Sequence, residues 1–537
     1  MSLPKTVADV LRDHVTLEVE GIDRMYLNVY VPQLQRELGV FGFLRYHRGH
    51  IFASSALLAP ISDAFIQAIV DFTQEHALPL LTFAKGQRKD DIAAEHLARF
   101  DQREGVLFVG KAQEKTPVFR TEKRRNPKTG QGYPWIVRSS AMVNHYYFYC
   151  VDEDFGPFFL KFCSYFPYNA KLCLNGHEYL KRQLAKEGIA FAALDNGILS
   201  CDDPKRLQQI ADGLDAAKID ALLRKWLAQL PHPFTTADRK AGYCYDLSIL
   251  QAEFSLTQVL DRPQTGRIFF EEVIRENLDL GRPDQVQLIF GRRVTKRTPG
   301  RFRTRVLTEG VTPTLHVDYK KSRIKQYHKE GRALRTETTI NDTRDFGIGK
   351  RLQNLPALRE VGFQANRRLL DVQTISQDCA VGEAVFRQVT QPREVDGQRA
   401  SALRYGDACV LALLSALLVF RLLPRGFCHR ELREHLAPLL GEDPNALTPG
   451  RMTYQLRRLR LHGLIVRQTG THRYGVTDHG LRIALFFTRS YARIVRPGLS
   501  QVTAADLPDD PPLRRAFTQL TCAMDQYVAQ AKLTSES

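Results

Sequence analysis

The segment from residue 404 to residue 500 constrains the fold more than any other part of the chain. Its apolar run at 408–420 predicts a buried helix, and residues 428–440 predict a second one. A Thr-Pro pair at 448–449 supplies an N-cap and a first-turn proline for a third helix, which Gly463 ends. The segment therefore predicts a compact C-terminal domain with a helical core.

Two short strands and a further helix complete this predicted domain. Residues 464–468 and 473–477 flank the turn Thr-Gly-Thr-His, and a helix at 479–495 follows. The order resembles the winged helix-turn-helix superfamily, in which a strand leads into a helix through a Thr-Asp-x-Gly sequence like that at 477–480. The resemblance implies that the third helix enters the major groove of DNA.

Side chains of the third helix fall into two groups. Met452, Leu456 and Leu459 recur at helical spacing and are expected to face the core. The resemblance implies base contacts from the open side of the helix, and phosphate or minor-groove contacts from the wing. The residues with these roles are Arg451, Gln455 and Arg458 on the helix and Arg467 and Arg473 on the wing. The alternative is a winged helix used for protein contact or internal packing.

The charge of the chain favours a polyanionic partner. Lys and Arg number 76 against 59 Asp and Glu, which gives a formal net charge of +17 and a pI of about 9.5. Nucleic acid is the leading candidate, with DNA first and RNA as the alternative, because the density of Lys and Arg does not separate the two. A basic surface without a partner is the other interpretation.

The length of 537 residues predicts roughly three or four domains, in a multidomain fold of the α/β and α+β classes. The expected parts are an N-terminal α/β domain at 20–200, a helical connector at 201–280, an antiparallel β-rich domain at 281–390, the winged helix at 404–500, and a C-terminal helix and tail at 501–537. Within the connector, residues 245–260 are expected to form a helix.

A dense run of positive charge opens the β-rich domain. Between residues 292 and 305 the sequence RRVTKRTPGRFRTR contains no acid, and it has the turn residues of a hairpin. Such a stripe can neutralise several phosphates, so binding is expected to weaken steeply with salt. The predicted contacts are Arg292, Arg293, Lys296, Arg297, Arg301, Arg303 and Arg305.

The next polar motif, at 323–342, predicts a hairpin with functional side chains on one face. Strand alternation groups Lys325, Tyr327 and Lys329 on the first strand with Arg335 and Glu337 on the second. The cations suit phosphate binding, while Tyr327 and Glu337 suit catalysis, with the tyrosine as a nucleophile or the glutamate in a metal-assisted step. The motif resembles one in replication initiators of filamentous phages and plasmids, which nick and join DNA. The alternative is a cross-strand ladder of ion pairs that supports the sheet.

A second candidate site lies in the N-terminal domain. Asp152 and Asp154 follow a strand and can share a divalent ion, Mg²⁺ or Mn²⁺, while His177 and Asp195 stand at two later junctions. The order of these residues resembles that in the palms of archaeo-eukaryotic primase-polymerases, which implies a catalytic role for all four. The alternatives are ordinary: a hairpin turn at 152–156 and helix-terminal charges elsewhere.

Nine scattered cysteines without CxxC spacing predict neither a zinc site nor a disulfide framework. The polar N-terminus predicts no signal peptide, and the run at 408–420 is too short to span a bilayer, which needs roughly 20 residues. The expectation is a cytoplasmic protein without membrane contact.

These patterns together predict a nucleic-acid-binding protein. The leading hypothesis is a metal-dependent DNA phosphodiester enzyme, a nuclease or a replication or transposition protein of a mobile element, that a winged helix directs to its site. The alternatives are a non-catalytic winged-helix regulator, an RNA-binding protein and a primase-like nucleotidyltransferase. As a whole the chain resembles a group of bacterial proteins, which implies a bacterial origin and adds no mechanism.

Overall fold

The computed structural model describes residues 7–84, 86–266, 269, 304–309, 312–377, 382–421, 423, 426–444, 446–495, 519 and 523. The chain forms two compact units. The first contains most of residues 9–367, and the second contains the described residues from 368 onward. Both contain helices and strands, so the protein is of mixed α/β type, as the sequence predicts.

A sheet of 11 strands organises the first unit, in the order β10-β11-β12-β13-β9-β1-β6-β5-β4-β3-β2. Neighbours pair antiparallel except β2 and β3, which are parallel. The strands are β1 (Val15–Tyr30), β2 (Leu80–Thr82), β3 (Gly105–Arg125), β4 (Gly132–Asp152), β5 (Gly156–Cys163), β6 (Ala170–Asn175), β9 (Asp246–Leu260), β10 (Thr304–Glu309), β11 (Thr312–Tyr319), β12 (Ser322–Lys329) and β13 (Ala333–Ile340).

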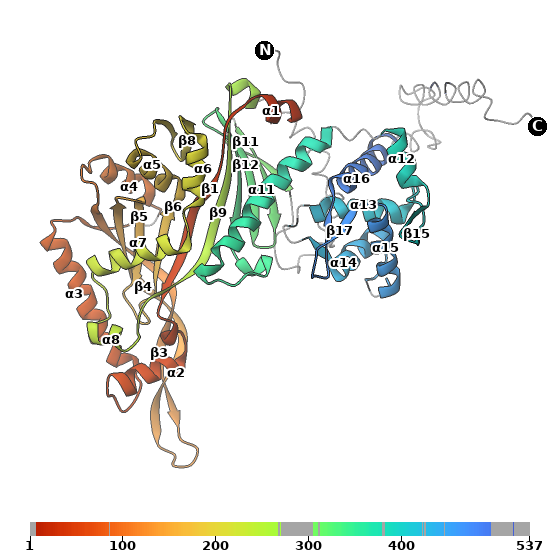
Figure 1. The fold of residues 1–537 in the computed structure, drawn as a ribbon. Coiled ribbons are helices and arrows are strands. Elements are labelled where there is room, and N and C mark those ends of the chain that lie inside the picture. Colours follow the sequence, from red (N-terminus) through yellow and green to blue (C-terminus); the bar gives the residue numbers. More distant parts are fainter. Residues whose placement is uncertain are drawn as a thin grey trace, which may run out of the picture. The chain divides into compact units, whose positions relative to one another are not determined.

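Strands that the sequence assigned to two separate domains thus lie in one sheet. β9 joins them, because it pairs with β1 on one side and with β13 on the other (Figure 1). The expectation of a helix at 245–260 is therefore wrong. Ala252, Phe254 and Leu256 alternate with polar residues at the period of a strand, and pairing on both edges satisfies the backbone.

Helices cover this sheet and supply its core. Phe65 and Ile69 of α3 are buried, and Trp226 of α7 packs against Phe158 of β5 with ring centroids 5.1 Å apart. The N-terminal part of α11 lies along β9, where Asn366 donates to the carbonyl of Phe254 (Figure 1). The elements around the sheet are α1 (Val7–Asp13), α2 (Glu37–Gly42), α3 (Ala59–Glu75), α4 (Lys89–Ala98), α5 (Gly176–Lys186), β7 (Phe191–Leu194), β8 (Gly197–Cys201), α6 (Pro204–Asp212), α7 (Ala216–Gln229), α8 (Thr236–Lys240) and α11 (Leu355–Gln377).

Capping side chains mark the start of several of these helices. Asn175 caps α5 and Asp203 caps α6, in each case through its side-chain oxygen. Within the described residues, one helical stretch, Ser55–Glu75, has the length and hydropathy of a membrane span. It carries Asp63 and Asp71 on its exposed side and buries Phe65, as an amphipathic helix at the edge of a core does.

The second unit has its own core, to which Leu413, Leu417, Met452, Leu459 and Ile483 contribute. Its three-stranded sheet has the order β16-β18-β17. Within residues 404–495 the helices α13, α14, α15 and α16 and the strands β17 and β18 follow one another in the predicted order. The elements of the second unit are α12 (Glu383–Thr390), β14 (Arg393–Val395), β15 (Gln398–Ala400), α13 (Ala408–Arg421), β16 (Phe427–Cys428), α14 (His429–Leu440), α15 (Pro449–Leu461), β17 (Ile465–Arg467), β18 (Arg473–Val476) and α16 (Asp478–Ser490).

Candidate functional site

The hairpin predicted at 323–342 is present as β12 and β13. Lys325 lies opposite Glu337 and Tyr327 opposite Arg335, and the two pairs are adjacent on the same face because paired residues share a side and alternate residues follow them. The sequence predicted the faces of the two strands, and the structure supplies the register that places these faces together. Arg335 in this hairpin is buried, whereas Lys325, Tyr327 and Glu337 are partly exposed.

Arg335 is the centre of a buried polar network. Its side chain has no exposed surface, and its guanidinium lies 2.9 Å from Asp23 Oδ2 and 2.9 Å from Glu337 Oε1. It also donates to the carbonyl oxygen of Asn196, in the turn between β7 and β8. Two carboxylates and a carbonyl thus surround the guanidinium, although its Nε makes no hydrogen bond of good geometry among the described residues.

His177 joins the same network from the first turn of α5. It is buried, and its Nε2 accepts a hydrogen bond from Arg335 and lies 3.2 Å from Ser255 Oγ. Burial and the charge of Arg335 lower the pKa of His177 to about 3, so the ring is neutral at physiological pH. Since Nε2 accepts, the proton is on Nδ1, which has no hydrogen-bond partner among the described residues.

The carboxyl groups of Asp23 and Glu337 both lie beside the Arg335 guanidinium, and their pKa values shift in opposite directions. Burial alone would raise the pKa of Asp23, but Arg335 and His177 outweigh it and hold the pKa well below its usual range. Burial and the negative charge of Asp23 raise the pKa of Glu337 to about 7. One buried pair therefore holds an ionised Asp23 and a glutamate that exchanges its proton near neutral pH.

Tyr327 completes the exposed edge of the network. Its hydroxyl donates to Glu337 Oε1 at 2.8 Å, and Lys325 Nζ lies 4.4 Å from the centre of its ring. Burial and the nearby Glu337 carboxylate raise the pKa of the phenol. The hydrogen bond places Glu337 as the acceptor of the tyrosine proton, while the raised pKa of the phenol opposes the loss of that proton in the absence of a substrate.

Asp152 and Asp154 do not belong to this network. Both oxygens of Asp152 are used: Oδ1 accepts from the amides of Asp154 and Phe155, and Oδ2 accepts from Lys225 and Trp226. Asp154 pairs with Lys186 at 2.7 Å. Among the described residues no group of three or more His, Cys, Asp or Glu side chains is placed to hold a metal ion. These two residues therefore do not fit the predicted Mg²⁺ or Mn²⁺ site.

Two other predicted residues lie at the rim of the hairpin. The side chain of Asp195 is 89% exposed, and its Oδ2 is 3.8 Å from Lys329 Nζ. The pair lies beside the turn that supplies Asn196, so Asp195 is close to the network in sequence but is not part of it.

The prediction that Gln455 and Arg458 lie on an exposed face of α15 is wrong. Gln455 is buried beside Cys409, and the buried guanidinium of Arg458 donates to the carbonyls of Ser401 and Ala402. The segment that precedes α13 covers this side of the helix, which the helical period alone does not reveal. The exposed residues of α15 include Thr453, Tyr454, Arg457 and Arg460.

The remaining predicted contacts of the second unit have protein partners. Arg451 pairs with Glu442 at 3.0 Å, and Arg473 pairs with Glu431 at 3.0 Å. Arg467 is exposed on β17 and donates to the carbonyl of Thr471. Of the basic block, Arg292, Arg293, Lys296, Arg297, Arg301 and Arg303 lie outside the described residues, as does the side chain of Arg305 in β10.

Asp23, Ser255 and Asn196 were not predicted as site residues from the sequence. Asp23 carries the one usable signal, because it is an acid inside a strand whose neighbours are mostly apolar. It sits where the pairing of β1 with β9 shifts between Ile22 and Arg24, a bulge that turns its carboxylate toward Arg335. Ser255 and Asn196 carry no comparable signal.

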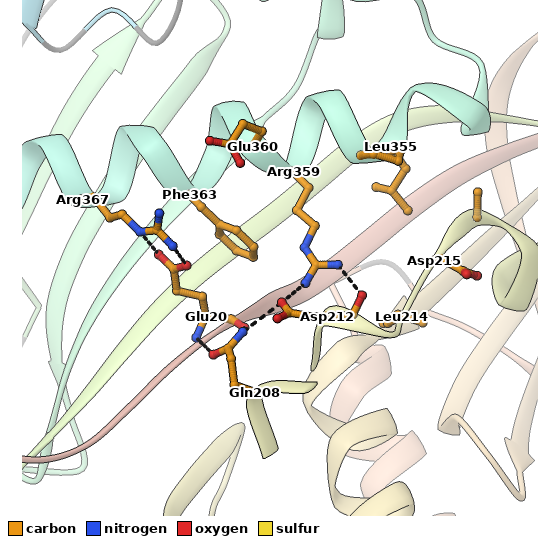
Figure 2. A pocket seen from close by; sticks show the side chains of 12 residues that line it. Glu20, Gln208, Asp212, Leu214, Asp215, Leu355, Arg359, Glu360, Phe363 and Arg367 are labelled. Atoms are coloured by element: carbon orange, nitrogen blue, oxygen red, sulfur yellow. Dashed lines mark hydrogen bonds and ion pairs between the residues drawn. The ribbon is translucent and has the colours of Figure 1, made fainter. Parts of the chain in front are cut away.

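A pocket of about 450 Å³ lies elsewhere in the first unit, between β1, α6 and α11 (Figure 2). Arg367 holds Glu20 through two hydrogen bonds, and Arg359 binds both the side chain and the carbonyl of Asp212. Phe363 lies between the two pairs in Figure 2. The two ion pairs join α11 to β1 and to α6, which is a structural role, while Asp215 and Glu360 leave the lining with more acids than cations.

No protein-family model, curated protein or solved structure matches the chain.

Proposed function

We propose that the chain is a DNA-binding protein whose residues 404–495 act as a winged helix-turn-helix, with α15 as the helix that enters the major groove. The observation that carries this proposal is the charge of α15. The helix contains four arginines and no acid, and Arg457 and Arg460 are exposed. An exposed helix face with this charge suits phosphate and base contacts.

The elements next to α15 support the same function. β17 and β18 join through a turn at 468–472, and Arg467 and His472 are exposed there. Exposed Arg430 lies on α14, the helix that precedes α15. Positive side chains thus accompany α15 on both neighbouring elements, as backbone contacts beside a groove-binding helix require.

The test is binding of full-length protein to duplex DNA, measured by fluorescence anisotropy over a range of salt concentrations. In Arg457→Ala/Arg460→Ala the slope of log K against log salt is expected to fall by about 2, since each lost phosphate contact removes about 0.9. The matched control is Arg404→Ala/Arg482→Ala, which removes two exposed arginines outside α15 and the wing. Equal losses in both variants, or no binding by the wild type, overturn the proposal.

A second candidate function is phosphodiester cleavage or transfer at the Tyr327–Glu337 edge. The observation that favours it is the hydrogen bond from the Tyr327 hydroxyl to Glu337, whose pKa is about 7. The Arg335 guanidinium lies 2.9 Å from the same glutamate oxygen. Wild type, Tyr327→Phe and Glu337→Gln are incubated with single-stranded, duplex and hairpin DNA in Mg²⁺ or Mn²⁺. Cleavage by the wild type that both variants lose supports it, and intact DNA in all reactions contradicts it.

A further inference from the structure

β3 and β4 continue beyond the body of the first unit as a two-stranded arm, residues 120–138 (Figure 1). Its strands pair from Arg120 opposite Val137 to Arg125 opposite Gly132. Asn126 and Gln131 close the turn with a 2.9 Å hydrogen bond between backbone groups. Six paired rows at about 3.4 Å each give an arm about 20 Å long.

The arm is strongly basic. It contains six Lys or Arg residues and one acid, Glu122, which pairs with Arg120 at 2.9 Å. Lys123, Arg125 and Lys128 are exposed, and none of them has a carboxylate within 4.0 Å among the described residues. Cations without acidic partners on an extended element are free to pair with phosphates.

The register of the arm separates its two faces. Lys123 and Arg125 lie opposite Pro134 and Gly132, and both cations are exposed. On the other face Arg124 lies over the ring of Trp135, with its guanidinium carbon 5.1 Å from the ring centre. The first face is therefore a contact face, and the second is packed.

Contacts at the base of the arm hold it in place. The ring of Phe41 in α2 packs against Trp135, with centroids 5.8 Å apart, and Glu37 accepts a hydrogen bond from the amide of Arg138. Val118 and Ile136 are buried at the junction with the sheet. An arm fixed in this way loses little conformational freedom when it binds.

We infer that this arm inserts into the major groove of duplex DNA and that Lys123, Arg125 and Lys128 contact its phosphates or base edges. The major groove of B-form DNA, about 12 Å wide and 8.5 Å deep, admits a two-stranded ribbon. The corresponding groove of A-form RNA is too narrow for side chains to read. The inference rests on the proposed function in one respect, which is that the ligand is DNA, and it uses a different surface.

The experiment compares Lys123→Ala/Arg125→Ala/Lys128→Ala with Arg88→Ala/Lys205→Ala/Arg332→Ala, which removes three exposed cations from other elements. Binding to a DNA duplex, an RNA duplex of the same sequence and single-stranded DNA is measured at several salt concentrations. For the DNA duplex, the slope of log K against log salt is expected to fall by about 2.7 in the arm variant. The affinity advantage of the wild type then shrinks by about 40-fold between 50 and 200 mM salt. The control variant keeps the wild-type slope.

The outcomes separate the arm from α15. A normal slope for the arm variant together with a reduced slope for Arg457→Ala/Arg460→Ala overturns the arm inference and leaves the proposed function standing. Equal losses of affinity for RNA duplex or single-stranded DNA also overturn it, because insertion in a B-form groove predicts a loss confined to duplex DNA. Absence of all DNA binding by the wild type defeats both.

Discussion

Asp23 and Arg335 are separated by 312 positions in the sequence, yet the carboxylate of one lies 2.9 Å from the guanidinium of the other in the buried interior of the sheet. β9 makes this contact possible, because it holds β1 and β13 on its two edges. The pair also positions His177 and Glu337, so residues from distant parts of the chain form one network.

Removal of the central cation is expected to destabilise the first unit strongly. Arg335→Met leaves the Asp23 carboxylate buried without a counter-ion, which costs about 3–5 kcal/mol. Urea unfolding followed by tryptophan fluorescence measures this loss selectively, because both tryptophans, Trp135 and Trp226, lie in the first unit. Asp23→Asn/Arg335→Met/Glu337→Gln removes all three charges and is expected to recover much of the loss. A single variant as stable as the wild type would contradict the charge balance described here.

The raised pKa of Glu337 predicts that the free energy of unfolding falls as the pH rises. The folded state binds the proton more tightly than the unfolded state, so the contribution of Glu337 to stability is complete below pH 4.5 and is lost as the pH rises to about 7. Glu337→Gln mimics the protonated form. Its free energy of unfolding relative to the wild type is therefore expected to increase by roughly 2–3 kcal/mol between pH 5 and pH 8.

The same urea titrations at several pH values check this expectation, with Glu330→Gln in the same hairpin as a baseline for an amide substitution. A difference between Glu337→Gln and the wild type that stays flat across this range would rule out the raised pKa of Glu337.

Asp152 is expected to act as a structural residue. Asp152→Asn weakens the bonds from Lys225 and Trp226 and is expected to lower the free energy of unfolding by about 1–3 kcal/mol, equally with and without Mg²⁺. Thermal unfolding of wild type and variant, with EDTA or saturating Mg²⁺, makes the comparison. A Mg²⁺-dependent rise in the melting temperature of the wild type that the variant lacks would restore the metal site predicted from the sequence.

Arg457 and Arg458 are neighbours on α15 with opposite expected roles. Arg458→Ala removes a buried guanidinium that binds two carbonyls, and is expected to destabilise the second unit by about 1.5–3 kcal/mol. Arg457→Ala is expected to leave stability unchanged and to weaken DNA binding. Far-UV circular dichroism combined with tryptophan fluorescence reads the two units separately, since the second unit has no tryptophan. If Arg457→Ala unfolds the unit while Arg458→Ala only weakens binding, the assignment of the two faces is wrong.

Local chemistry explains which parts of this fold the sequence could predict. Thr448 and Pro449 mark the start of α15, and the alternation around Tyr327 and around Arg335 gives the face of each strand on which these side chains lie. These signals lie within a few residues of the elements that they describe. The sequence therefore identified His177, Tyr327 and Glu337 as candidate site residues, although it placed them in two separate sites.

Long-range pairing explains what the sequence could not predict. The sequence around β9 carries no signal that the strand pairs on both edges, and its apolar residues are therefore equally consistent with a buried helix. Asp23 stands out in the sequence as an acid inside a strand, but nothing near it indicates that its partner is Arg335, 312 positions away. The burial of Arg458 depends in the same way on the path of residues 401–402, which helical periodicity cannot indicate.

The pairing of β13 with β9 also sets the order in which the protein is assembled during translation. β9 ends at Leu260, and its second edge stays open until the strand that ends at Ile340 has been synthesised. At 5–20 residues per second these roughly 80 residues take about 4–16 s. For that interval the nascent chain presents an uncovered strand, and Asp23 has no cation. The speed of elongation over residues 261–340 therefore determines how long each new molecule is vulnerable to misassembly on the ribosome.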